Sequence, residues 1–120
     1  MATYSKQLLS GSTYGQPITI SNTSSTGNLI HATQISSTAI DEVWLYATNT
    51  SSSAANLTIQ YGGTGSVQNA ITLTIPATSG LTLVVPGLVL TGTGAAVSYV
   101  YAYATVANVI TVSGYVNRVQ

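Results

Sequence analysis

Full charge is almost absent from this chain of 120 residues. Only 3% of it is Lys, Arg, Asp or Glu, and the formal net charge is zero, whereas an ordinary soluble domain is about 25% charged. The charged residues are Lys6, Asp41, Glu42 and Arg118. A freely diffusing monomer normally depends on surface charge for its solubility. Two positive side chains cannot neutralise a phosphate backbone, so the composition predicts no nucleic-acid partner.

Cysteine is missing altogether. Its absence excludes a disulfide framework and thiolate metal ligands. His31 is the single histidine, and Asp41 and Glu42 are the only acidic side chains. A metal site needs several such ligands in one place. The sequence therefore predicts neither a metal site nor a cofactor. A Ca²⁺ ion held largely by backbone carbonyls is the one alternative left open.

Long apolar runs are missing as well. Near the N-terminus the only apolar pair is Leu8-Leu9, and the longest apolar block, residues 81–90, is broken by Pro86 and Gly87. A signal peptide needs an apolar run of about 7–15 residues, and a membrane helix needs about 20. We therefore expect a protein made in the cytoplasm with no signal peptide and no membrane partner.

Serine and threonine take the place of charge. The chain has 15 serines and 19 threonines, and 45% of its residues are hydrophobic. The apolar share is large enough to build a core. A hydroxyl-rich, uncharged surface repels its neighbours little and can form hydrogen bonds with them. These properties predict a protein that works as an assembly.

Apolar and polar residues alternate with a period of two along most of the chain, which is the pattern of half-buried strands. No window has helical spacing, and we expect no helix longer than two turns. Turn-forming residues separate strands that recur about every 8–14 residues, as in an antiparallel sandwich. The expected strands are Ser5–Leu9, Pro17–Ser21, Leu29–Ile35, Glu42–Thr48, Asn56–Tyr61, Ala70–Ile75, Leu81–Val85, Val97–Ala104 and Val109–Asn117.

The predicted fold is an all-β antiparallel sandwich of the jelly-roll kind, with about eight strands. Residues 17–120 are expected to form a single domain. Residues 1–16 form either an extended N-terminal arm or an edge strand of the same sheet. If this segment is an arm, Tyr4, Leu8 and Leu9 are the candidate anchors on a partner.

Two segments are apolar on both strand faces, namely residues 42–47 and 81–90. Such strands are buried on both sides. Their second face is covered by loops, by the N-terminal segment or by another copy of the chain. A compact jelly roll with deeply buried central strands is the competing interpretation.

A catalytic site is not expected. A triad of a serine with His31 and Asp41 is conceivable, but triads are recognised by geometry, and serine is abundant here. His31 alternates with apolar neighbours, which favours a hydrogen-bonded and partly buried histidine. Adjacent Asp41 and Glu42 point to opposite faces of a strand and make a poor acid–base pair. We expect that the protein is not an enzyme.

Tyr99, Tyr101 and Tyr103 lie on one face of an expected strand. Sugars stack on such aromatic rings, so a carbohydrate site is one interpretation. Packing in the core or in an interface, where tyrosine buries its ring and keeps its hydroxyl bonded, is the favoured one.

Four stretches resemble small virion proteins of tailed bacteriophages, such as capsid decoration (cement) proteins and related head or tail accessory proteins. They are ATYSKQLLSGST at residues 2–13, DEVWLYATNTS at 41–51, TIPATSGLTLVVPGLVL at 74–90 and NVITVSGYVNRV at 108–119. Together they cover roughly half of the chain. None is a functional motif, so no site residue is carried over.

This resemblance implies a β-sandwich or jelly-roll protomer that assembles on an icosahedral shell and has no enzymatic activity. It also implies a small oligomer, with a trimer favoured and a dimer as the other option. We therefore expect a capsid decoration protein that binds itself and the major capsid protein of a phage, and that resides in the virion. The alternative is a module at a tail tip or fibre that binds a host glycan through aromatic residues.

Overall fold

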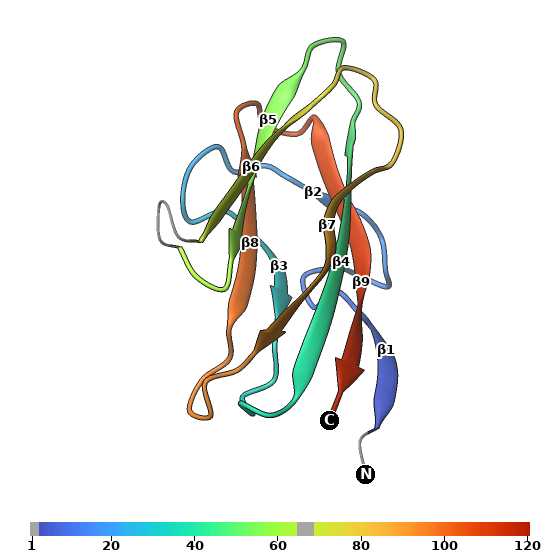
Figure 1. The fold of residues 1–120 in the computed structure, drawn as a ribbon. Helices are drawn as coiled ribbons and strands as arrows, with labels where there is room; N and C mark the ends of the chain where they lie inside the picture. Colours follow the sequence, from blue (N-terminus) through green and yellow to red (C-terminus); the bar gives the residue numbers. More distant parts are fainter. Residues whose placement is uncertain (1–2, 65–68) are drawn as a thin grey trace.

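The computed structural model describes residues 3–64 and 69–120, and it confirms an all-β sandwich of two antiparallel sheets (Figure 1). Sheet A has the order β1-β9-β4-β7, with β2 also paired to β9, and sheet B has the order β3-β8-β5-β6. The strands are β1 Tyr4–Leu8, β2 Ile18–Thr19, β3 Asn28–Ala32, β4 Ile40–Asn49, β5 Ala55–Tyr61, β6 Ala70–Ile75, β7 Thr82–Thr91, β8 Tyr99–Ala104 and β9 Ile110–Val119.

The strand pairs nest around the β5–β6 hairpin. Moving outward along the chain, β4 pairs with β7, β3 pairs with β8, and β1 and β2 pair with β9, all antiparallel. The end of the chain therefore lies beside the start of β1, where the backbones of Thr3 and Gln120 exchange two hydrogen bonds. The described part of the chain contains no helix, and so none that could cross a membrane.

The core fills the space between the two sheets. Alternating residues of β4 and β9 point inward from sheet A, and Val100, Ala102 and Ala104 of β8 meet them from sheet B. The alternation agrees with the predicted period of two, and the tyrosines of β8 turn outward. Other core residues are Leu9, Ile20, Ile30, Val43, Leu45, Ala47, Leu57, Ile59, Ile75, Val85, Ile110, Val112 and Val116.

Strand β7 is longer than its sequence predicts. Pro86 and Gly87 were expected to end a strand at residue 85, but β7 continues through them to Thr91. This correction has a simple cause, since β7 is an edge strand of sheet A. A proline at a sheet edge sacrifices no ladder hydrogen bond. The register against β4 shifts on both sides of Trp44, so the strand passes Pro86 and Gly87 as an irregular edge.

Residues 4–8 form an edge strand of the chain's own sheet. Each of the five residues of β1 pairs with a residue of β9, from Tyr4 opposite Val119 to Leu8 opposite Tyr115. Of the two interpretations of the N-terminal segment, the edge strand is the one that the structure supports. After β1 the chain crosses to sheet B, where the Gly11 amide donates to the Ile30 carbonyl of β3.

Candidate functional site

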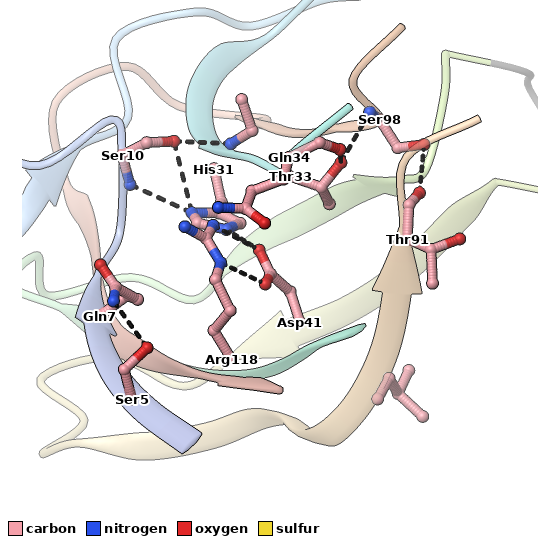
Figure 2. A network of polar contacts seen from close by, with 12 residues as sticks. Ser5, Gln7, Ser10, His31, Thr33, Gln34, Asp41, Thr91, Ser98 and Arg118 are labelled. Atoms are coloured by element: carbon pink, nitrogen blue, oxygen red, sulfur yellow. Dashed lines mark hydrogen bonds and ion pairs between the residues drawn. The ribbon is translucent and has the colours of Figure 1, made fainter. Parts of the chain in front are cut away.

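A buried polar network joins the two sheets near this crossing (Figure 2). His31 on β3 meets Asp41 on β4 with a distance of 2.7 Å between Nε2 and Oδ2, and both side chains are 1% exposed. Arg118 on β9 holds the same carboxylate with two hydrogen bonds, from Nε to Oδ1 at 2.7 Å and from its second guanidinium nitrogen to Oδ2 at 2.9 Å. Asp41 and Arg118 are cross-strand partners in sheet A, which places the pair in register.

Ser10 closes the network from the loop that follows β1. Its backbone amide donates to Nδ1 of His31 at 3.1 Å, and its Oγ lies 3.3 Å from the same nitrogen. Because Nδ1 accepts a backbone hydrogen bond, the proton of the imidazole resides on Nε2 and is donated to Asp41. His31 is therefore neutral in this arrangement, and it links the loop to both sheets.

The protonation equilibria follow from burial and from these contacts. Burial lowers the pKa of His31 below its ordinary value, and the hydrogen bond and charge of Asp41 offset this only in part. Burial acts to raise the pKa of Asp41, but the hydrogen bonds from Arg118 and His31 outweigh it and hold that pKa below its ordinary value. The carboxylate of Asp41 thus stays ionised, and it raises the pKa of Arg118.

His31 and Asp41 are the two named members of the conceivable triad, and the structure brings them together with one serine, Ser10. The group lacks the geometry of nucleophilic catalysis. The Oγ of Ser10 already accepts a hydrogen bond of 2.6 Å from the Ala32 amide. The lone pair on Nδ1 that would take the serine proton is already occupied by the Ser10 amide. No pocket opens beside this group in the described residues. The hydrogen bonds of this network join the loop after β1 to both sheets, which is a structural role.

Arg118 is the member of this network that sequence reasoning missed. The available signal was the charge count, because a carboxylate on an inward strand position requires a cation. Only Lys6 and Arg118 could supply one. Choosing between them required the register of β4 against β9, which composition does not contain.

The outer face of sheet A is apolar and aromatic around its centre. Trp44 on β4 stacks on Tyr115 of β9, with ring centroids 6.3 Å apart and planes 12° apart. Several apolar side chains around this pair are well exposed. They are Tyr4 and Leu8 on β1, Ile40 on β4, and Leu83 and Val89 on β7. The described chain thus leaves an apolar sheet face in contact with solvent, which single-chain proteins seldom do.

Two charged side chains lie on this outer face, and each is held by an aromatic neighbour. The Nζ of Lys6 is 4.8 Å from the centre of the Tyr115 ring, which is a cation–π distance. Glu42 accepts hydrogen bonds from Nε1 of Trp44 at 2.7 Å and from the Asn117 amide at 3.1 Å. These two hydrogen bonds lower the pKa of Glu42.

Gly87 allows the indole of Trp44 to lie across the neighbouring strand. A Cβ at position 87 would come within 2.8 Å of Cζ2 of Trp44, and the backbone there has a φ of 81°. Only glycine satisfies both conditions at little cost. The close approach to Gly87 and the hydrogen bond to Glu42 together hold the indole ring in one position over the sheet.

The outer face of sheet B has a different chemistry. Tyr99 and Tyr101 of β8 stack with ring centroids 5.5 Å apart. Beside them, hydroxyl and amide groups pair across β5 and β6, with Thr58 to Thr72 at 3.3 Å and Thr74 to Asn56 at 2.9 Å. No Lys, Arg, Asp or Glu occurs in any strand of this sheet. The β8 tyrosines therefore do not pack in the core, because they lie on the outer face. Their packing in an interface, the other half of the favoured interpretation, stays a prediction.

The three candidate anchors at the N-terminus divide between surface and core. Tyr4 is 79% exposed and Leu8 is 58% exposed, and both lie on the outer face of sheet A. Leu9 is 2% exposed and belongs to the core between the sheets. The expectation for Leu9 is corrected accordingly. It directly follows β1, where the alternation turns its side chain inward, and there it stabilises the fold.

Comparison with known proteins adds no family to this description: no family model, curated protein or solved structure matches the chain. Within residues 3–64 and 69–120, no group of three or more metal-ligating side chains gathers in one place. The two outer faces and the buried network are therefore the features of the molecule that bear on its function.

Proposed function

We propose that the protein is a non-enzymatic structural subunit of a tailed-bacteriophage particle, a capsid decoration protein that oligomerises and bridges capsid subunits. The observation that carries this proposal is the apolar outer face of sheet A. Tyr4, Leu8, Leu83 and Val89 are each between 46% and 79% exposed there. A face of this kind is suited to burial against protein, and it occurs in a chain with almost no charge to keep it apart from its neighbours.

We further propose that the protomer is a jelly roll. The nested antiparallel pairs, from β5 with β6 outward to β1 and β2 with β9, support this topology. A jelly roll is a long hairpin rolled into two sheets of four strands, and viral capsid proteins use it repeatedly. If β1 and β2 count as one interrupted strand, the chain has eight.

The proposed mechanism is stapling. A subunit that binds only the assembled shell stabilises the shell by mass action, because its binding free energy is lost when the shell comes apart. A specific interface of standard size buries about 1,200–2,000 Å² in total. A chain with principal extents of 49 × 26 × 21 Å offers a sheet face of sufficient area.

The test of this function is the location of the protein in phage particles. Particles from lysates of cells that carry this gene are banded on a density gradient and analysed by quantitative mass spectrometry. The proposal expects the chain in the band of DNA-filled heads, at a copy number comparable to that of a capsid subunit. A chain that remains with the unassembled proteins at the top of the gradient would contradict it.

A second candidate function, glycan binding at a tail tip or fibre, is favoured by the stacked Tyr99 and Tyr101 on the outer face of sheet B. Aromatic rings beside paired hydroxyl groups are suited to a sugar ring. Glycan-array binding by the wild-type protein, abolished by Tyr99→Ala at unchanged thermal stability, would support this function. If the protein has this second function, the gradient experiment should find the chain in the fractions that contain phage tails.

A further inference from the structure

Lys6 and Glu42 lie in one row across the outer face of sheet A. Lys6 is the cross-strand partner of Asn117, and Asn117 is the partner of Glu42. The two opposite charges are thus two strand spacings apart, about 9.6 Å, with β9 between them. Neither forms an ion pair within the described residues. The row therefore presents one positive and one negative group on either side of a central strand.

Such a row is complementary to itself under one kind of rotation. A twofold axis that lies in the plane of the face and runs along β9 exchanges its two sides, so Lys6 of one copy faces Glu42 of another. An axis in the same plane but along the row would place Lys6 against Lys6 and Glu42 against Glu42. Facing like charges costs several kcal/mol, which selects the axis along β9.

We propose that the outer face of sheet A binds the same face of a second copy, as a dimer with its twofold axis along β9. This inference rests on the proposed function and names the partner of its assembly face. The contact is isologous, so each Lys6–Glu42 pair occurs twice. Two sheets that pack face to face, about 10 Å apart and within about 30° of alignment, are a common arrangement.

The apolar rows of the same face agree with this axis. Leu8, Tyr115 and Trp44 form the next row across β1, β9 and β4. The rotation places Leu8 opposite Trp44 of the second copy and Tyr115 opposite its own equivalent. In the row that contains Tyr4, Val119 and Ile40, it places Tyr4 opposite Ile40. On β1, β9 and β4, every apolar side chain of these rows meets an apolar or aromatic one. Strand β7 lies beyond this overlap, because sheet A has two strands on one side of β9 and one on the other at these rows.

Dimerisation through this face would explain how a subunit of this size can bridge others. The outer faces of the two copies of sheet B then point in opposite directions. Each carries the stacked tyrosines and the threonine pairs. The dimer thus has two identical surfaces, and it can contact two neighbouring subunits of a shell at once.

Charge reversal followed by mixing tests the arrangement. In 0.15 M salt, which screens long-range attraction, light scattering behind a sizing column should give the wild type twice the chain mass of 12.3 kDa. We expect K6E alone and E42K alone to dimerise at least about 100-fold more weakly, because each faces like charges twice. An equimolar mixture of the two should recover the dimer mass, since both charge pairs are then restored. The double variant K6E/E42K should also be a dimer.

Three results would overturn the proposal. They are a wild-type monomer at millimolar concentration, a wild-type trimer, and single charge variants that remain dimers. Tyr99→Ser on the outer face of sheet B is the matched control and should leave the dimer mass unchanged. If a charge reversal prevents folding, Tyr4→Ser decides instead, because Tyr4 is 79% exposed, and its loss should weaken the dimer about 10-fold.

The outcome is separable from that of the proposed function. A monomer that is nonetheless found in phage heads would leave the decoration function standing and remove only the second copy as the partner of this face. A dimer that is absent from the particles would remove the decoration function and leave the second copy as the partner of this face.

Discussion

The two sheets of the sandwich differ in where they carry charge. All four charged side chains of the protein lie in strands of sheet A: Lys6 on β1, Asp41 and Glu42 on β4, and Arg118 on β9. Sheet B has none, and its outer face is built from tyrosine and from paired hydroxyl and amide groups. Charge in this molecule is therefore not a general means of solubility. It is placed on one sheet, for particular contacts.

Within sheet A the charges divide again by direction. Asp41 and Arg118 point inward and neutralise each other beside His31. Lys6 and Glu42 point outward among apolar side chains. The inward pair joins the sheets of one chain, and the outward pair gives the apolar face a preferred orientation toward a partner. The following predictions test this division, from the largest expected effect to the smallest.

The largest effect is expected at Asp41, with its neighbour Glu42 as the matched control. Asp41→Asn removes the charge that compensates Arg118 and should lower the free energy of unfolding by about 3 kcal/mol or more. Glu42→Gln changes a solvent-facing carboxylate one residue away. At chain concentrations low enough for both proteins to be monomers, it should leave the unfolding midpoint nearly unchanged. Urea denaturation followed by circular dichroism measures both. Equal losses in the two variants would show that the inward and outward charges of β4 do not differ in role.

The next largest effect is expected for a substitution of Gly87, because this residue determines where Trp44 lies on the outer face. Gly87→Ala combines a backbone of positive φ with a Cβ that meets the indole ring, and it should cost about 2 kcal/mol. The emission of Trp44, the single tryptophan, should shift because the indole is displaced. Gly80→Ala is the control, since a Cβ there meets no atom within 4 Å. An unchanged emission spectrum for Gly87→Ala would refute this account of the indole's position.

A pH dependence follows from His31, whose pKa in the folded protein is lowered by burial. Between that value and about 6.5, the pKa of an unperturbed histidine, the unfolded chain binds more protons than the folded one. Stability should therefore be complete above about pH 6.5 and should decrease as the pH falls through this window. The lowered pKa of Asp41 acts in the same direction, below about pH 3.9.

Thermal unfolding from pH 8 to pH 4.5 measures this dependence, and His31→Gln isolates the histidine. Glutamine can donate to Asp41 and accept from Ser10, but it does not titrate. The decrease in melting temperature between pH 6.5 and pH 5 should therefore be reduced in the variant. A variant with the wild-type pH profile would assign that decrease to another group.

The smallest effect is expected on the outer face of sheet B. Tyr99→Ser removes one ring of the exposed stack and should change the free energy of unfolding by less than about 0.5 kcal/mol. Denaturation in urea checks this value. A loss of several kcal/mol would mean that the tyrosine stripe supports the fold, and the contrast between the two outer faces would weaken.

The sequence was most informative where one face of a strand is buried. In β8 the alternation correctly places the tyrosines on one face and Val100, Ala102 and Ala104 on the other. It did not show which of the two faces points into the core. The double-sided apolarity of residues 42–47 fits the central position of β4, but the same pattern in residues 81–90 lies on the edge strand β7. The pattern could not show that the second face would be only half-covered, since that depends on which strands and loops lie beside it.

The features that the sequence did not predict depend on contacts between distant segments. Pro86 ends a strand in a central position but not at an edge, and the edge position of β7 comes from the sheet order. The contact of His31 with Asp41 was considered only as one part of a triad. The clamp by Arg118 requires β9 to lie against β4 in the observed register, a pairing that spans most of the chain.

The central claim is that the outer face of sheet A is covered by protein when the molecule works. Trp44, the only tryptophan, lies on that face and tests the claim most directly. Its emission and its quenching by acrylamide should be measured over a dilution series from millimolar to nanomolar chain. The account predicts a protected, blue-shifted indole at high concentration that becomes quenchable and red-shifted on dilution, with a midpoint that K6E moves to higher concentration. An indole with the same emission and the same quenching at every concentration would contradict self-association through this face.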